Sequence, residues 1–216
     1  MAGFFITIEG IDGSGKSTQA RLLRDKLVEI GHDVILTREP GGSKGAEEIR
    51  SLLLQGNTDR WSAETEILLF TAARRDHVER LIEPALIADQ TVICDRFVDS
   101  TRIYQGYAHH NLRKLVDKLH NLMIFRNPDL TILIDIDPTI GLKRSFARSN
   151  HETRFENLGT AKQSIMRNNF LKLANDFPDR FVVFDGERDF GIIAKDIFSY
   201  VTKFNATQTT AKTHNG

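Results

Sequence analysis

The chain has 216 residues, of which 40% are hydrophobic and 27% are charged, and its 29 basic and 29 acidic residues give a formal net charge of zero. This composition is typical of one compact globular domain, and the charge balance argues against a protein that grips long nucleic acid. The single cysteine, Cys94, excludes an internal disulfide, and no Cys/His group has zinc-site spacing. No apolar segment of the printed sequence is long enough to span a bilayer, so a cytoplasmic protein with no membrane partner is expected.

Short apolar runs predict strands at Phe4–Ile8, Val34–Thr37, Thr91–Cys94, Leu130–Ile136 and Phe181–Phe184. Each run is nearly continuously apolar, which favours strands buried on both faces of a parallel sheet. Helical spacing is found at 20–30, Ala63–Ala88 (interrupted near Pro84), Leu112–Phe125, Pro138–Arg148, Ala161–Leu173 and Ile192–Phe204. The alternation of strands and helices predicts a right-handed, doubly wound α/β fold. We expect one domain over 1–204 and a frayed polar tail at 205–216.

A glycine-rich segment follows the first predicted strand and matches G-x-x-x-x-G-K-[ST] in full. Glycines let backbone N–H groups close around phosphate oxygens, and the helix that follows presents its positive end. Lys16 is expected to neutralise the β- and γ-phosphates of ATP, and Ser17 to bind Mg²⁺. The alternative is a glycine-rich turn with an accidental lysine. The candidate ATP-binding residues are Gly10, Ile11, Asp12, Gly13, Ser14, Gly15, Lys16, Ser17 and Thr18.

Charged residues follow two of the predicted strands. Asp95 and Arg96 come directly after the third strand, and Arg38 and Glu39 end the second. In open α/β sheets, ligands bind at the carboxyl ends of the strands. Asp95 is therefore expected to reach Mg²⁺ through water and Arg96 to clamp a phosphate, although both could form a surface salt bridge. Arg38 and Glu39 are candidates for a substrate site, unless their loop is only a turn.

Phe70 and Arg74 are four residues apart on a predicted helix and therefore share one face. A ring and a guanidinium together could hold a base, whereas Phe70 by itself is more typical of a packed core.

Three arginines, Arg144, Arg148 and Arg154, surround the polar segment Ser145–Asn150. This segment is either a lid that closes arginines over ATP or a solvated helix end. A lid would exclude the water that otherwise accepts the phosphoryl group.

Taken together, these motifs resemble the thymidylate kinase family over nearly all of Phe4–Phe204. The resemblance is carried by Gly10–Thr18, Thr37–Gly42, Phe70–Arg74, Asp95–Phe97, Ser100–Thr101, Tyr104–Gly106, Asn127–Asp135 and Gly141–Arg144. It implies a P-loop NTPase fold with a five-stranded parallel sheet flanked by helices, a lid at about 143–157, and a homodimer. It implies that the enzyme transfers the γ-phosphate of ATP to dTMP, with Mg²⁺ as cofactor, giving dTDP and ADP for dTTP synthesis.

The resemblance also implies roles for single residues. Phe70 would stack on thymine, Arg74 would bond to its carbonyl edge, and Tyr104 would crowd the 2′ position of the sugar. The residues implied for dTMP are Arg38, Glu39, Phe70, Arg74, Arg96, Ser100, Thr101, Tyr104 and Gln105. Those implied for catalysis are Lys16, Arg96, Arg148, Arg154 and Asp12, and Arg144 is expected near the adenine.

The phosphate loop carries no arginine, so the chain resembles the bacterial variant of the family, in which the lid supplies the cation. Ser145-Phe146 stands where some relatives carry another arginine. Arg102 replaces a smaller residue, so it either alters the acceptor pocket or points to solvent.

Two other functions remain open from the sequence. The first is a kinase for another acceptor, such as a deoxynucleoside or a different nucleoside monophosphate. The second is a P-loop regulatory module that binds nucleotide without turnover.

Overall fold

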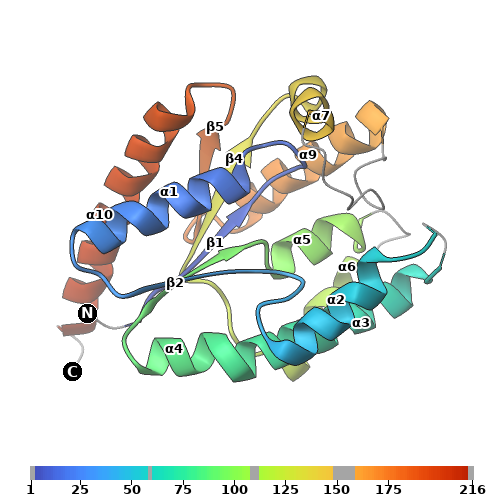
Figure 1. Ribbon diagram of the computed structural model, residues 1–216, viewed down its shortest axis with the longest axis horizontal. Coiled ribbons are helices and arrows are strands. Elements are labelled where there is room, and N and C mark those ends of the chain that lie inside the picture. Colours follow the sequence, from blue (N-terminus) through green and yellow to red (C-terminus); the bar gives the residue numbers. More distant parts are fainter. Residues whose placement is uncertain (1–2, 58–59, 108–111, 148–158, 214–216) are drawn as a thin grey trace.

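The computed structural model describes residues 3–57, 60–107, 112–147 and 159–213. Across these residues, five parallel strands form one sheet in the order β2-β3-β1-β4-β5 (Figure 1). The strands are β1 (Phe5–Glu9), β2 (Val34–Arg38), β3 (Thr91–Asp95), β4 (Leu130–Asp135) and β5 (Phe181–Asp185). The helical segments are α1 (Lys16–Glu29), α2 (Lys44–Leu54), α3 (Ala63–His77), η1 (Val78–Ile82), α4 (Glu83–Ile87), α5 (Val98–Tyr104), α6 (Arg113–Met123), α7 (Pro138–Phe146), α9 (Gly159–Asp176) and α10 (Phe190–Thr213).

The five predicted strands and the parallel α/β fold are confirmed. The long helical stretch is also present: η1 is a π-helical turn between α3 and α4, and Pro84 lies in the first turn of α4, where a missing N–H is tolerated. The sequence did not predict α2 and α5, and α10 continues to Thr213 rather than ending at Phe204. No glycine or proline interrupts the chain between Ile192 and Thr213, so nothing local stops this helix.

The sheet has an apolar core on each face. Along β1, Ile6 and Ile8 face a cluster with α1 and α10, whereas Phe5 faces the opposite cluster with α3, η1, α4 and α6. A third cluster beneath α9 contains Leu133 and Phe170. Successive side chains of a strand point to opposite faces, so strands covered on both faces are apolar at successive positions. No helix in the described ranges is long and apolar enough to cross a bilayer.

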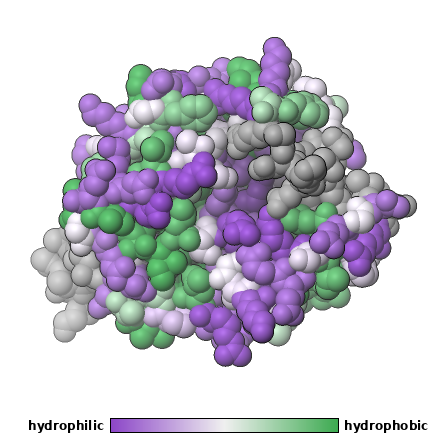
Figure 2. All heavy atoms as spheres, in the orientation of Figure 1, coloured by the Kyte–Doolittle hydropathy of each residue, from purple (hydrophilic) through white to green (hydrophobic). Residues whose placement is uncertain are grey.

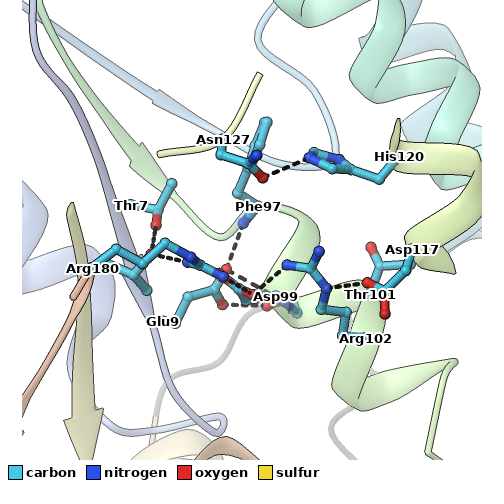
Figure 3. Close-up of polar contacts among 12 residues, drawn as sticks. Thr7, Glu9, Phe97, Asp99, Thr101, Arg102, Asp117, His120, Asn127 and Arg180 are labelled. Carbon is cyan, nitrogen blue, oxygen red and sulfur yellow. Dashed lines mark hydrogen bonds and ion pairs between the residues drawn. The ribbon is translucent and has the colours of Figure 1, made fainter. Parts of the chain in front are cut away.

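A buried ionic cluster joins α5 to the start of β5 (Figure 3). Arg180 donates hydrogen bonds of 2.7 and 2.9 Å to Asp99, and Arg102 donates another of 2.7 Å. Arg180 also bonds to the Thr131 hydroxyl of β4 at 2.7 Å. Burial by itself raises the pKa of Asp99, but the hydrogen bonds and charges of the two arginines outweigh it and leave this pKa below its usual value.

Arg102 belongs to this cluster, so the solvent-directed alternative for its side chain is wrong. The side chain is only 7% exposed, and it bonds to both Asp99 and Asp117 at 2.7 Å. Its guanidinium lies 5.8 Å from the centre of the Phe177 ring. Two carboxylates and an aromatic face compensate its charge, and pairing of this kind lets an arginine lie inside a fold.

Replacing Asp99 by alanine is expected to lower the free energy of unfolding by about 3–5 kcal/mol, because it leaves the largely buried Arg180 guanidinium without its carboxylate and Arg102 with Asp117 alone. Urea denaturation at pH 7 measures this change. Because the pKa of Asp99 is lowered by folding, its contribution is complete above the unfolded value of about 3.9 and is lost as the pH falls through the folded value. Asp196→Ala, which removes the exposed partner of Arg188, is the control and is expected to cost less than about 1 kcal/mol. Equal losses in the two variants would contradict the assignment.

Candidate functional site

The glycine-rich segment forms an open loop between β1 and α1, as the motif predicts. Gly13 has φ of +77°, and a Cβ there would lie 1.9 Å from the carbonyl oxygen of Gly141 in α7. Gly15, with φ of +96°, caps the start of α1. Side chains at these two positions would be strained or would clash, so the glycines leave the loop backbone exposed for a bound anion. Figure 2 shows a hydrophilic hollow in the area where Figure 1 places the starts of α1 and α5.

Lys16, the first residue of α1, folds back over this loop. Its Nζ donates a 2.8 Å hydrogen bond to the carbonyl oxygen of Ile11, and the residue is 6% exposed. Burial, together with the charge of Arg96, lowers the pKa of Lys16 to about 8. A bound phosphate would supply the negative charge that favours the ammonium form.

Ser17 and Asp95 meet although 78 positions separate them in the sequence. The Ser17 hydroxyl donates directly to Asp95 Oδ2, while Asp95 Oδ1 is buried and has no hydrogen-bond partner among the described residues. The pairing of β1 with β3 aligns Ile8 with Asp95 and so brings the end of β3 to the loop. Among the described residues, no three His, Cys, Asp or Glu side chains gather in a group that could hold a metal ion.

Arg96 turns toward the loop from the end of β3. Its φ is +72°, an uncommon backbone conformation for a residue with a side chain. The guanidinium donates to Asp12, to the Ser100 hydroxyl at 3.0 Å and to the Gly10 carbonyl oxygen at 3.4 Å. It lies 5.0 Å from the centre of the Tyr104 ring. Burial by itself lowers the pKa of Arg96. Tyr104 and nearby carboxylates raise this pKa by more than burial lowers it, so the guanidinium stays positively charged.

Tyr104 completes this group on the side of α5. Its hydroxyl lies 3.2 Å from Asp12 Oδ2, to which it donates, and 3.3 Å from the Arg96 guanidinium. Burial raises the pKa of Tyr104 well above its usual value, so the hydroxyl keeps its proton at neutral pH. The predicted residues Asp12, Arg96, Ser100 and Tyr104 therefore surround one position beside the phosphate loop.

A second group of predicted residues lies deeper, between β2, α3 and α5. Arg74 donates to Glu39 at 2.8 Å and to the Thr101 hydroxyl at 2.9 Å, and its guanidinium lies 5.1 Å from the centre of the Phe97 ring. Gln105 donates to a Glu66 oxygen at 3.1 Å. The side chains of Arg74 and Glu39 are nearly inaccessible to solvent, at 2% and 3% exposed. Such a pair is rigid, because each charge requires the other.

Three predicted residues have looser surroundings. Phe70 is half-buried one turn before Arg74 on α3. Arg38 is exposed and pairs with Glu47 of α2 at 3.1 Å. Arg144 donates to the Gly186 carbonyl oxygen at 2.9 Å and lies 5.1 Å from the centre of the Phe190 ring, close to the phosphate loop.

Phe190 contacts both Arg144 and the phosphate loop, which shows that Arg144 lies beside the loop. A Cβ on Gly15 would lie 2.8 Å from the Phe190 ring, so that ring covers the start of α1. Arg144 therefore lies beside the phosphate loop, and its expected place near the adenine stays a prediction. Arg148, Arg154 and most of the expected lid at 143–157 lie outside the described residues.

Sequence reasoning assigned no role to His77, which contacts Glu39, or to Thr37, which contacts His77. His77 is fully buried, and its Nδ1 lies 3.2 Å from Glu39 Oε1. Its Nε2 lies 2.8 Å from the Thr37 hydroxyl. Because a carboxylate only accepts hydrogen bonds, Nδ1 carries the proton in this pair. The three-residue step from Arg74 to His77 was the available signal, since it puts both residues on one face of α3.

The family model for thymidylate kinase matches residues 8–197. The thymidylate kinase of Ruegeria pomeroyi is 61% identical over 207 residues, covering 95% of this chain and 98% of that protein. The thymidylate kinase of Dinoroseobacter shibae is 58% identical over 200 residues, covering 93% and 97%. A crystal structure of thymidylate kinase from Ehrlichia chaffeensis superposes with a TM-score of 0.74 at 35% identity, covering 94% of this chain and 99% of that one. The chain therefore belongs to the thymidylate kinase family.

Proposed function

We propose that the residues around the phosphate loop carry out the reaction of the family in this protein. That reaction is transfer of the γ-phosphate of ATP to dTMP, giving dTDP and ADP. The observation that carries the assignment is the convergence of Lys16, Arg96 and the Ser17–Asp95 pair at one edge of the sheet, next to the Arg74–Glu39 pair. A donor site and an acceptor site thus lie side by side.

Phosphoryl transfer needs positioning and charge neutralisation rather than covalent chemistry by the protein. The loop N–H groups and Lys16 would hold the ATP phosphates, and Arg96 would hold the dTMP phosphate in line. The acceptor oxygen is already largely ionised at neutral pH, so no general base is required. Asp12 keeps Arg96 turned to the loop before substrate binds. The lid residues Arg148 and Arg154 are proposed to stabilise charge on the group in transit.

The base of dTMP would lie between Phe70 and Arg74. Phe70 would offer its half-buried ring for stacking, and Arg74 offers N–H groups whose direction Glu39 and Thr101 hold. Gln105, held by Glu66, and the exposed Arg38 would complete the acceptor site. A rigid set of donors next to an aromatic ring suits a pyrimidine with carbonyl groups, because unpaired buried donors would penalise other bases.

The residues around Ser17 fit a magnesium ion. The hydroxyl of Ser17 and the carboxylate of Asp95 are in contact, and the second oxygen of Asp95 is buried without a described partner, so it can accept from water bound to a cation. Mg²⁺ keeps several waters and takes few protein oxygens together with phosphates. When bound, the ion supplies neutralisation of the β- and γ-phosphate charge.

A homodimer is proposed through the face formed by α3 and α6. These helices pack together, and Arg75 of α3 donates a 2.9 Å hydrogen bond to the carbonyl oxygen of Met123. Apolar side chains stay exposed on α3, on α6 and just beyond the end of α6: Leu68 is 56%, Leu122 is 67% and Phe125 is 73% accessible. Neighbouring exposed apolar side chains of this size are typical of a surface that another chain covers.

The assay that tests the function is Mg²⁺-ATP-dependent release of ADP with dTMP, dUMP, dCMP, dGMP, AMP and thymidine supplied separately. Turnover is expected to be strongest with dTMP. Phe70→Ala is expected to lower kcat/KM for dTMP about 5- to 150-fold, because a stacked base is worth about 1–3 kcal/mol, and to leave the KM for ATP unchanged. Ile87→Ala, at an 81% exposed position on α4, is the control. Preference for another monophosphate would support phosphoryl transfer but contradict the proposed thymine site at Phe70 and Arg74. ATP binding without turnover of any acceptor would contradict the proposed kinase function.

Ser17→Ala is expected to raise the Mg²⁺ concentration for half-maximal activity about 10- to 100-fold, because it removes an oxygen from the proposed magnesium site. Activity is measured during a magnesium titration after treatment with EDTA. Ser199→Ala on α10 removes a serine hydroxyl far from the loop and should follow the wild-type curve. An unaltered requirement in Ser17→Ala would exclude Ser17 from the magnesium site.

The double variant Leu122→Asp, Phe125→Asp is expected to elute with the mass of a monomer, because two buried carboxylates would oppose association. Size-exclusion chromatography with light scattering measures this mass. Ile87→Asp, equally exposed but on α4, should leave the dimer intact. A wild-type monomer, or a double variant that remains a dimer, would rule out this face.

A further inference from the structure

Glu9, the last residue of β1, lies fully buried at the junction of the two half-sites. Its Oε1 accepts hydrogen bonds from the backbone N–H of Phe97 at 2.7 Å and of Ser100 at 3.3 Å. Its Oε2 accepts from the Ser100 hydroxyl at 2.6 Å. Figure 3 shows the carboxylate directed at the start of α5, next to Asp99. Neither sequence patterns nor the roles assigned above include this residue.

These contacts hold the segment that directly follows Arg96 in the chain. Phe97 follows it in the chain, and the Ser100 hydroxyl accepts a 3.0 Å hydrogen bond from its guanidinium. Arg96 itself has the uncommon positive φ, which persists only where the surroundings impose it. The Ser100 hydroxyl donates to Glu9 and accepts from Arg96, so it relays the position of one side chain to the other.

We propose that Glu9 is the positioning residue of the acceptor clamp. Its carboxylate holds the backbone after Arg96 and the Ser100 hydroxyl, so that the Arg96 guanidinium points at the phosphate of dTMP. This inference rests on the proposed role of Arg96. Glu9 precedes Gly10 directly, so the same side chain also sets the distance between the donor loop and the acceptor helix.

A purely structural role would call for a different residue here. Burial, reinforced by the charge of Asp99, raises the pKa of Glu9 to about 7, although Ser100, Arg96 and Phe97 oppose the shift. A group whose pKa is raised by folding loses stabilising effect as the pH rises from its unfolded value through the folded one. The ionised carboxylate therefore destabilises the folded state at neutral pH, and Glu9→Gln would remove this destabilisation.

Other charged and titratable groups face this carboxylate from the neighbouring elements. Lys16 lies on α1, Cys94 lies on β3 and Asp99 lies on α5. Arg180 reaches the cluster through Asp99. These groups are shared by wild type and a Glu9→Gln variant, so a comparison of the two isolates the Glu9 charge.

The test is Glu9→Gln, assayed at pH 8, with Glu83→Gln as control. Glu83 is the first residue of α4, away from the phosphate loop, and its carboxylate lies 2.6 Å from the Arg126 guanidinium. Glu9→Gln is expected to raise the KM for dTMP about 10- to 100-fold, since a small misplacement of a binding group has effects of this size. The KM for ATP should stay within about twofold, as the loop amides and Lys16 remain. The melting temperature should equal or exceed that of wild type, and Glu83→Gln should leave both KM values unchanged.

The pH profile gives a second measurement. In wild type, the KM for dTMP should rise as the pH falls through about 7, because protonated Glu9 carries a hydroxyl that competes with Arg96 for the Ser100 oxygen. The phosphate of dTMP titrates near pH 6 in both proteins. In Glu9→Gln, the rise in the KM for dTMP near pH 7 should be absent, whereas the rise near pH 6 should remain.

Three outcomes would overturn the proposal: a Glu9→Gln protein with wild-type KM for dTMP, one whose KM for ATP rises equally, or one that fails to fold or melts well below wild type. The last would show that the carboxylate serves the fold. If the wild-type protein itself failed to phosphorylate dTMP, the proposed function would fall first, and this result is separate from the comparison of variants.

Discussion

The central position of β1, paired in parallel with β3 and β4, is the constraint on which the site depends. Parallel pairing brings the carboxyl ends of neighbouring strands to the same edge, and the pairing of Ile8 with Asp95 puts the phosphate loop beside the end of β3. Ser17 can then reach Asp95, and Arg96 can reach Asp12. Shifting the register of this pair by one residue would reverse every side chain of β1 and separate these partners.

Two guanidinium groups of the site are held by carboxylates before any substrate is present. Arg96 contacts Asp12, and Arg74 contacts Glu39. A buried cation without a partner would be strongly destabilising, so these pairs keep the guanidinium groups charged and directed. The phosphates of ATP and dTMP bring further negative charge, which is why a protein of zero net charge can still concentrate cations at one edge.

Further buried polar groups contact Glu39 and Ser100, which in turn bond to the two guanidinium groups. His77, itself bonded to Thr37, contacts Glu39, and Glu9 contacts Ser100. None of these three side chains is exposed to solvent, so their effect on ligands passes through the residues they contact. Donors held in this way lose little conformational freedom when a ligand binds, and this preorganisation favours affinity and rate.

Much of the fold was predictable, because strands buried on both faces must be apolar at successive positions, and the five runs beginning at Phe4 show this pattern. The phosphate loop was equally predictable, since its glycines, Lys16 and Ser17 are adjacent in the chain. Two short or weakly patterned helices, α2 and α5, were missed because tertiary contacts stabilise them more than local spacing does. The sequence by itself thus determined the fold class, the loop and which residues could serve as cations. Only the tertiary structure decided which carboxylates hold Arg96 and Arg74, that Arg102 joins Asp99 and Asp117 inside the fold, and that Glu9 contacts Ser100 and His77 contacts Glu39. Those contacts join residues far apart in the chain.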